Sequence, residues 1–214
     1  LLAMKGSIIF LSLVFLPLVK SDDTEDPSLS YRADVYNYED PTNWLNQTFV
    51  LLRATERHWH RGNSMCLKSE FTRKNDKGVF FHNVTYRAAT LTEDGRGVLS
   101  KHTIQIKIKV VKEKGRQPKL SIKEVKKGNP KNNEMFSEYW PVLYSGASCI
   151  ILGGFGEPYV KNSCTMWVPL DLVDDVDPAC YYIILSECTT PLYKGYESEM
   201  PTCDILDSLG NGPK

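Results

Sequence analysis

Two glutamates are the side chains best suited to ligand chemistry in this sequence. Glu56 ends a β-rich run, and Glu138 directly precedes Tyr139 and Trp140. A carboxylate next to aromatic rings suits a cationic amine, because ion pairing and cation–π attraction then act on the same charge. The same glutamates also fit the wetted rim of a sheet, and the sequence leaves both interpretations open.

Metal binding and catalysis are both disfavoured. His58 and His60 occupy alternate positions, which share one face of a strand and would let two imidazoles bind one ion. Arg57 and Arg61 flank them and would repel a cation, so we interpret this segment as an exposed loop and expect no bound metal. The motifs HExxH, GxSxG and Walker A do not occur in the sequence, and no GxGxxG follows a strand. We therefore expect a binding protein without a cofactor rather than an enzyme.

Eight β-rich runs separated by short turns must position these side chains. In the fourth run, Ile104, Ile106 and Ile108 alternate with polar residues, and a strict period of two predicts one buried face and one wet face. An up-and-down barrel leaves no open edge in such a series, and about eight strands enclose room for one small ligand. The runs cover residues 48–55, 65–72, 79–88, 102–111, 119–125, 138–144, 149–155 and 163–168.

Helical segments are expected on either side of this series. A short helix is expected near residues 41–45, before the first strand. Asp177 followed by Pro178 is a typical helix start and predicts a helix over residues 179–188. The predicted fold class is therefore all-β, an eight-stranded antiparallel barrel with a long C-terminal segment that contains one α-helix.

The N-terminal residues have the features of a secretory signal. Lys5 precedes an apolar run that is too short to cross a bilayer, because a spanning helix needs about 20 residues. We expect residues 1–21 to be a signal peptide with Met4 as its start. Residues 22–40 are then an acidic arm, and residues 41–214 form one domain. The protein is expected to be secreted, since no other apolar run is long enough to cross a membrane.

Cysteine usage agrees with export. Six cysteines in an oxidising compartment predict three disulfides, for which there are fifteen possible connectivities. Asn46 and Asn83 each open an N-glycosylation triplet and are the expected glycan sites. The cysteines are Cys66, Cys149, Cys164, Cys180, Cys188 and Cys203.

The charge is balanced overall but uneven along the chain. The sequence has 26 Lys and Arg against 26 Asp and Glu, so it gives no reason to expect a nucleic-acid partner. From Lys101 to Lys131 there are eleven basic residues and only two acidic ones, Glu113 and Glu124. This stretch fits either the solvated outer faces of strands or a basic patch for an anionic surface or a host protein. We expect a monomer.

Six short motifs occur in a characteristic order and spacing. They are residues 40–44 before the first strand, LLRAT (51–55), Cys66 opening the second strand, YSGASC (144–149), CTMW (164–167) and DPAC (177–180). Together these motifs resemble a tick salivary lipocalin of the histamine-binding protein family. The resemblance implies a lipocalin barrel with the C-terminal helix packed outside, and sequestration of a small inflammatory mediator such as histamine or serotonin. It also implies the disulfides Cys66–Cys203 and Cys149–Cys180, which leaves Cys164 to pair with Cys188.

This sequence departs from the amine-binding relatives at two positions. Ile150 and Thr165 stand where such relatives carry acids, so Glu56 and Glu138 are the expected partners of an ammonium group. Trp44 and Trp167 are then expected to supply the aromatic walls, together with Tyr139. The alternatives are a carrier of a leukotriene, fatty acid or sterol, or a protein-binding immunomodulator that inhibits complement or clotting.

Overall fold

A computed structural model describes residues 39–55, 64–91, 94–95, 97–113, 117–125, 139–153, 163–190 and 192–210. The predicted signal peptide and nearly all of the acidic arm lie outside these residues, so both stay predictions. Among the described residues, no helix combines the length and the apolar character needed to span a membrane.

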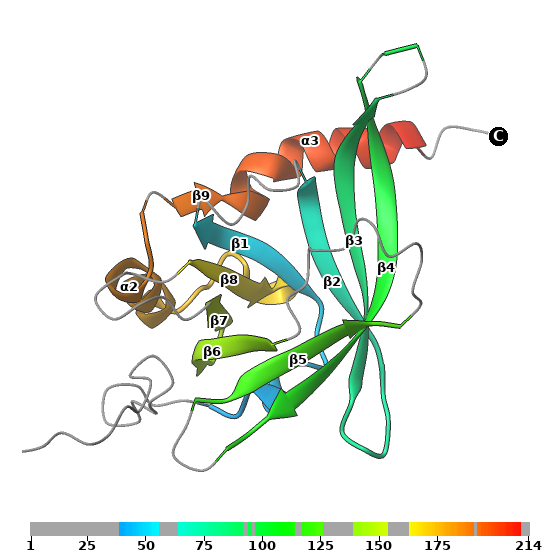
Figure 1. Cartoon of the computed structure of the whole chain (residues 1–214). Coiled ribbons are helices and arrows are strands. Elements are labelled where there is room, and N and C mark those ends of the chain that lie inside the picture. Colours follow the sequence, from blue (N-terminus) through cyan, green and yellow to red (C-terminus); the bar gives the residue numbers. More distant parts are fainter. Residues whose placement is uncertain are drawn as a thin grey trace, which may run out of the picture.

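Eight antiparallel strands form a closed barrel (Figure 1). Each strand pairs with the next along the chain, and β1 closes the ring by pairing with both β8 and β2. The predicted barrel is thus confirmed. The strands are β1 (Phe49–Thr55), β2 (Ser64–Lys74), β3 (Phe80–Leu91), β4 (Gly97–Val111), β5 (Lys119–Glu124), β6 (Tyr139–Gly146), β7 (Cys149–Gly153) and β8 (Cys164–Pro169).

The alternation in β4 divides the interior of the barrel from its outer face, as the sequence predicts. Ile106 and Ile108 are buried, whereas Lys107 and Lys109 are exposed. Residues directly opposite one another in neighbouring strands share a face, and the buried residues Phe80 and Ile122 lie opposite Ile108. The inward-facing residues of the strands form one apolar cluster in the interior of the barrel.

The 3-10 helix η2 (Pro41–Asn43) and the residues after it cover one end of the barrel. The Asp40 carboxylate accepts a hydrogen bond from the Thr42 amide at 3.0 Å and so caps this helix. The buried side chain of Leu45 then joins the interior cluster. The short helix expected here from the sequence is confirmed, and we call this end of the barrel the covered end.

His82 connects the covered end to the barrel wall. Its ring is fully buried, with Nε2 2.8 Å from the Leu45 carbonyl oxygen and Nδ1 3.0 Å from the Ser69 hydroxyl. A carbonyl oxygen only accepts, so Nε2 carries the proton and Nδ1 accepts the Ser69 hydroxyl hydrogen. The neutral imidazole therefore satisfies both partners.

Helix α2 (Pro178–Glu187) packs on the outer face of β6, β7 and β8. Asp177 caps it by accepting from the Ala179 amide at 2.8 Å, which confirms the predicted helix start. Buried side chains of α2, with Ile183 and Ile184 among them, form a second apolar cluster with the outward residues of those strands. The short 3-10 helix η3 (Leu170–Leu172) links β8 to this region.

The expectation of a single helix in the C-terminal segment is corrected by strand β9 (Leu192–Lys194) and helix α3 (Gly195–Gly210). Helix α3 crosses the upper ends of β1 and β2 in Figure 1. Pro201 lies inside it, and a proline at an interior position removes one helical hydrogen bond and disfavours a helix. Contacts with the barrel must therefore stabilise α3.

All three predicted disulfides are present: Cys66–Cys203, Cys149–Cys180 and Cys164–Cys188. The last two attach α2 and its C-terminal cap to β7 and β8. The first attaches α3 to β2 across 137 residues of sequence. Closing a loop of that length contributes about 5 kcal/mol in the chain-entropy model.

The two predicted glycan sites lie in different surroundings. Asn46 is exposed, in the segment between η2 and β1. Asn83 is half-buried at an outward position of β3, between Glu70 of β2 and Gln105 of β4. Glycosylation of either residue stays a prediction.

His82 predicts a stability that depends on pH. Burial lowers the pKa of His82, although its two hydrogen bonds oppose the shift. The unfolded chain therefore binds more protons than the folded protein once pH falls below about 6.5, and the free energy of unfolding decreases there. We expect a lower Tm at pH 5.5 than at pH 7.5 in circular-dichroism melts. His82→Phe should reduce this difference, and an unchanged difference would contradict the assignment.

Candidate ligand-binding site

The interior of the barrel is lined mostly by apolar side chains. Its cluster contains buried aliphatic and aromatic residues from every one of the eight barrel strands except β8. Strand β8 contributes Trp167, which is partly buried against the same cluster. A ligand inside the barrel would therefore meet a largely apolar wall, on which a few polar groups decide orientation.

Tyr86 and His102 form one of the polar groups on this wall. They lie directly opposite each other in β3 and β4. This pair is two residues along each strand from the opposite pair Val84 and Ile104, and so faces the same side of the sheet. Their rings stack with centroids 5.2 Å apart and an interplanar angle of 20°. Tyr86 packs against the interior cluster, so both rings face inward, away from the covered end.

Glu124 places a carboxylate on the same wall. It is the last residue of β5, lies directly opposite the buried Ile106, and follows the inward Ile122 by two positions. Burial raises the pKa of the Tyr86 hydroxyl, and the negative charge of Glu124 raises it further. The carboxylate thus acts on the Tyr86 hydroxyl from nearby. A carboxylate beside stacked aromatic rings can bind a protonated amine by ion pairing and cation–π attraction.

The two glutamates that the sequence singled out, Glu56 and Glu138, lie outside the described residues, as do His58 and His60. Their neighbours mark where the described strands stop, since Thr55 ends β1 and Tyr139 begins β6. Whether either glutamate faces a ligand stays a prediction. Within the part of the chain that is described, no three His, Cys, Asp or Glu residues are grouped as a metal site would need.

Strand β6 presents Trp140, rather than its neighbour Tyr139, to the interior. Tyr139 lies opposite Ser121 and is 50% exposed, whereas Trp140 lies opposite the buried Leu120 and packs against the interior cluster. Successive residues of a strand point to opposite faces. The predicted site residue Tyr139 is therefore on the outer surface.

The two predicted tryptophans both contact the interior cluster, from different places. Trp167 lies opposite Leu51 and Ile150, and its Nε1 donates to the Thr165 hydroxyl at 3.0 Å. Trp44 lies at the covered end, where its Nε1 donates to a Glu39 carboxylate oxygen at 3.0 Å. The structure brings both rings to one cluster.

The inward groups Tyr86, His102 and Glu124 were not among the candidates that the sequence suggested. The sequence contained a usable signal, because His102 stands two positions before Ile104. It therefore extends the alternation of Ile104, Ile106 and Ile108 toward the start of the strand. Glu124 likewise continues the period of Leu120 and Ile122. Extending each apolar alternation to its first polar member would have found both residues.

Strand β9 and helix α3 complete the barrel wall where β1 and β2 separate. This happens at the end of the barrel opposite the covered end, which we call the far end. Only Phe49 and Val50 of β1 are paired with β2, opposite Ser69 and Lys68. Further along β1, residues 53–55 pair with β9 instead. Gly195 lies so close to this edge that a Cβ there would be 2.5 Å from the Leu51 carbonyl oxygen.

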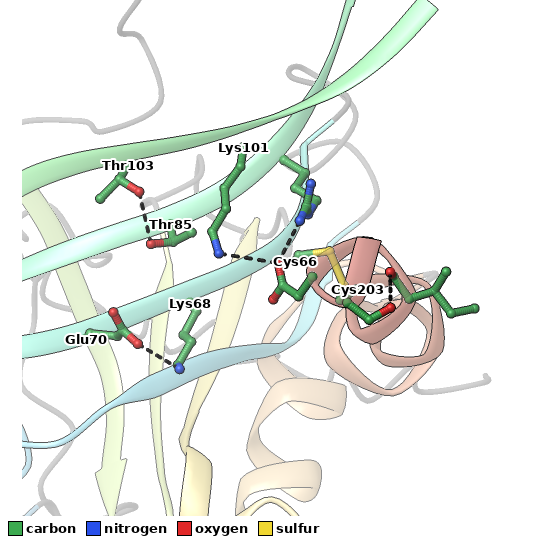
Figure 2. A network of polar contacts seen from close by, with 11 residues as sticks. Cys66, Lys68, Glu70, Thr85, Lys101, Thr103 and Cys203 are labelled. Atoms are coloured by element: carbon green, nitrogen blue, oxygen red, sulfur yellow. Dashed lines mark hydrogen bonds and ion pairs between the residues drawn. A yellow bond between two sulfur atoms is a disulfide. The ribbon is translucent and has the colours of Figure 1, made fainter. Parts of the chain in front are cut away.

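Polar contacts and one disulfide attach α3 to the strands (Figure 2). The Glu199 side chain is only 4% exposed and accepts from the Cys66 amide at 2.7 Å and the Tyr193 hydroxyl at 2.9 Å. Near the C-terminal end of α3, Asp207 accepts from Arg87 at 2.6 Å and from Lys101 at 3.3 Å. These contacts join α3 to β2, β3 and β4 around the far end.

Comparison with known proteins agrees with this architecture. The family model for tick histamine-binding protein matches residues 30–204. The chain belongs to this family. Membership identifies a ligand-binding protein rather than an enzyme.

A solved structure gives a second comparison. Japanin from Rhipicephalus appendiculatus bound to cholesterol is similar over 67% of this chain and 87% of its own, with a TM-score of 0.51 and 17% identity. At this identity the likeness shows the lipocalin fold alone. No curated protein matches the chain.

The anchoring of α3 gives a prediction for unfolding. Glu199→Ala should lower the free energy of unfolding by about 1–3 kcal/mol, because the Cys66 amide loses its buried acceptor. Glu197→Ala is a matched control on the same helix, since Glu197 is partly exposed and pairs with Arg53 at 2.8 Å. Such a pair contributes about 0–1 kcal/mol. Urea unfolding measures both, and equal losses would show that Glu199 does not anchor the helix.

Proposed function

We propose that this protein is secreted and sequesters a small aromatic amine, such as serotonin or histamine, inside the barrel. The observation that carries the proposal is the inward Glu124 carboxylate, whose charge acts on the hydroxyl of Tyr86, a ring that stacks on His102. The family to which the chain belongs is named for histamine binding, which supports the same ligand class. Three disulfides fit an oxidising, extracellular compartment.

The cost of burying charge makes the carboxylate decisive. An ammonium group that leaves water without an ionic partner loses several kcal/mol of solvation free energy. Neither Ile150 nor Thr165 can supply that partner, since neither side chain is ionised. Glu124 can, and the inward aromatic residues Tyr86 and Trp140 offer ring faces for the amine and its aromatic group.

Calorimetry with serotonin and histamine tests the role of Glu124. Glu124→Gln should weaken amine binding more than about tenfold, which is 1.4 kcal/mol, because it removes the charge and keeps the shape of the side chain. Glu70→Gln is the matched control, since Glu70 lies on the outer face and pairs with Lys68 at 2.7 Å.

The same titrations include Glu56→Gln and Glu138→Gln, which cover the carboxylates first singled out from the sequence. A large loss in one of these variants alone would move the ammonium site to that residue. Tight amine binding that is indifferent to all three substitutions would contradict a carboxylate-based site.

A sterol or fatty acid is the second candidate ligand, and the apolar interior favours it. The similar solved structure, Japanin, is described as bound to cholesterol. Native mass spectrometry of the secreted protein separates the two candidates. A co-purified lipid that amines do not displace would favour the lipid carrier, and an empty barrel that takes up serotonin would favour the amine.

A further inference from the structure

An open cleft lies at the covered end of the barrel, between the segment that follows η2 and the 3-10 helix η3. Its volume of about 610 Å³ is within the range of pockets that hold a small ligand. The Leu170 amide donates to the Thr48 carbonyl oxygen at 2.9 Å and so joins the two sides of the cleft. The lining residues are Trp44, Gln47 and Thr48 on one side, and Leu170, Asp171 and Leu172 on the other.

The polar side chains of this cleft are available to a ligand. Gln47 and Thr48 are half-buried and Asp171 is exposed. None of these three side chains forms a hydrogen bond or an ion pair within the part of the chain that the structure describes. The cleft therefore combines an aromatic ring and aliphatic side chains with groups that can donate or accept hydrogen bonds.

Trp44 is held in place at the edge of the cleft. Its Nε1 donates to a Glu39 carboxylate oxygen at 3.0 Å, and its ring packs against the interior cluster that contains Leu45. Its backbone amide donates to the Pro41 carbonyl oxygen at 3.2 Å, at the end of η2. A ring that is already fixed in this way loses little side-chain entropy when a ligand packs against it.

A reverse turn places Asn46 beside Trp44. The Gln47 amide donates to the Trp44 carbonyl oxygen at 3.2 Å, which is the hydrogen bond of a β-turn, and Asn46 is the third residue of that turn. Asn46 is exposed, whereas its neighbour Leu45 is buried. The two residues that complete its glycosylation triplet, Gln47 and Thr48, both line the cleft. A glycan on Asn46 would therefore start at the rim of the cleft.

The first sugar of an N-linked glycan matches these lining residues. It is an N-acetylglucosamine bonded directly to the asparagine side-chain nitrogen, so it stays within one sugar length of Asn46. One face of its ring carries only C–H groups, which pack against an aromatic ring such as that of Trp44. Its hydroxyl and acetamido groups can donate to the Asp171 carboxylate and exchange hydrogen bonds with the Gln47 amide.

We propose that Asn46 is glycosylated and that the first N-acetylglucosamine binds in this cleft against Trp44. The sugar then connects the segment between η2 and β1 to η3 and stabilises the covered end. The proposal needs the secretory pathway, in which N-linked glycans are attached, but it does not use the amine site. Failure of amine binding would therefore leave it unchanged.

Thermal unfolding of the secreted protein in different glycan states tests this contact. An Asn83→Gln background leaves Asn46 in the one remaining Asn-x-Ser/Thr triplet. An endoglycosidase then leaves a single N-acetylglucosamine on Asn46, and sugar-free protein comes from a glycan amidase or from Asn46→Gln. The single sugar should raise the Tm by about 2–4 °C, the shift that one good side-chain contact gives in a domain of this size.

Substitutions of aromatic residues test whether the Tm gain comes from Trp44. Each variant is compared in its single-sugar and sugar-free forms, so that its own effect on stability cancels. The gain should vanish in Trp44→Leu. It should persist in Tyr139→Leu, a matched control whose ring is exposed on the outer surface of β6.

The opposite side of the cleft supplies a second variant. Leu170→Ala/Asp171→Ala changes two exposed residues, so it should fold even if Trp44→Leu does not, and it should remove at least half of the gain. Mass spectrometry that found no glycan on Asn46 of the secreted protein would overturn the proposal. Equal Tm values for the single-sugar and sugar-free proteins, or a gain that survives both cleft variants, would overturn it as well.

Discussion

The edge of β1 that faces β2 is where this barrel must close, and pairing with β2 satisfies only the first part of that edge. An unpaired edge presents free amide and carbonyl groups, which invite pairing with another chain. Here residues 49 and 50 pair with β2, and residues 53–55 pair with β9. Helix α3 then lies against both β1 and β2, where the Cys66–Cys203 disulfide and Glu199 hold it. The C-terminal segment is therefore part of the wall.

In the closed barrel, each strand has one face in a largely apolar interior and one face toward the outside. Inside, charge is costly, so the buried His82 is neutral and hydrogen-bonded on both nitrogens, and Glu124 stands near the end of a largely apolar wall. Outside, the same strands carry lysines at the alternate positions. One alternation of residues thus separates a largely apolar interior from a basic outer surface.

Sequence patterns over a few neighbouring residues predicted the elements that those neighbouring residues determine. The period of two in β4 and the Asp177–Pro178 start of α2 needed only neighbouring residues, and the resemblance to relatives supplied the disulfide pairs. Helix α3 was missed because Pro201 argues against a helix, while the contacts that stabilise it come from residues such as Cys66 and Arg87, far away in sequence. Tyr139 was favoured over Trp140 because the direction of a side chain depends on strand register, which the sequence of β6 alone does not fix.

We propose that an inward carboxylate on β5 receives the charge of a small ligand within a closed barrel. A crystal structure of the protein with serotonin tests it most directly. We expect ligand density inside the barrel, with the ammonium nitrogen at about 2.7–2.9 Å from a Glu124 carboxylate oxygen and the indole against inward aromatic rings. Serotonin bound outside the barrel, or inside it with its ammonium group away from Glu124, would contradict the claim.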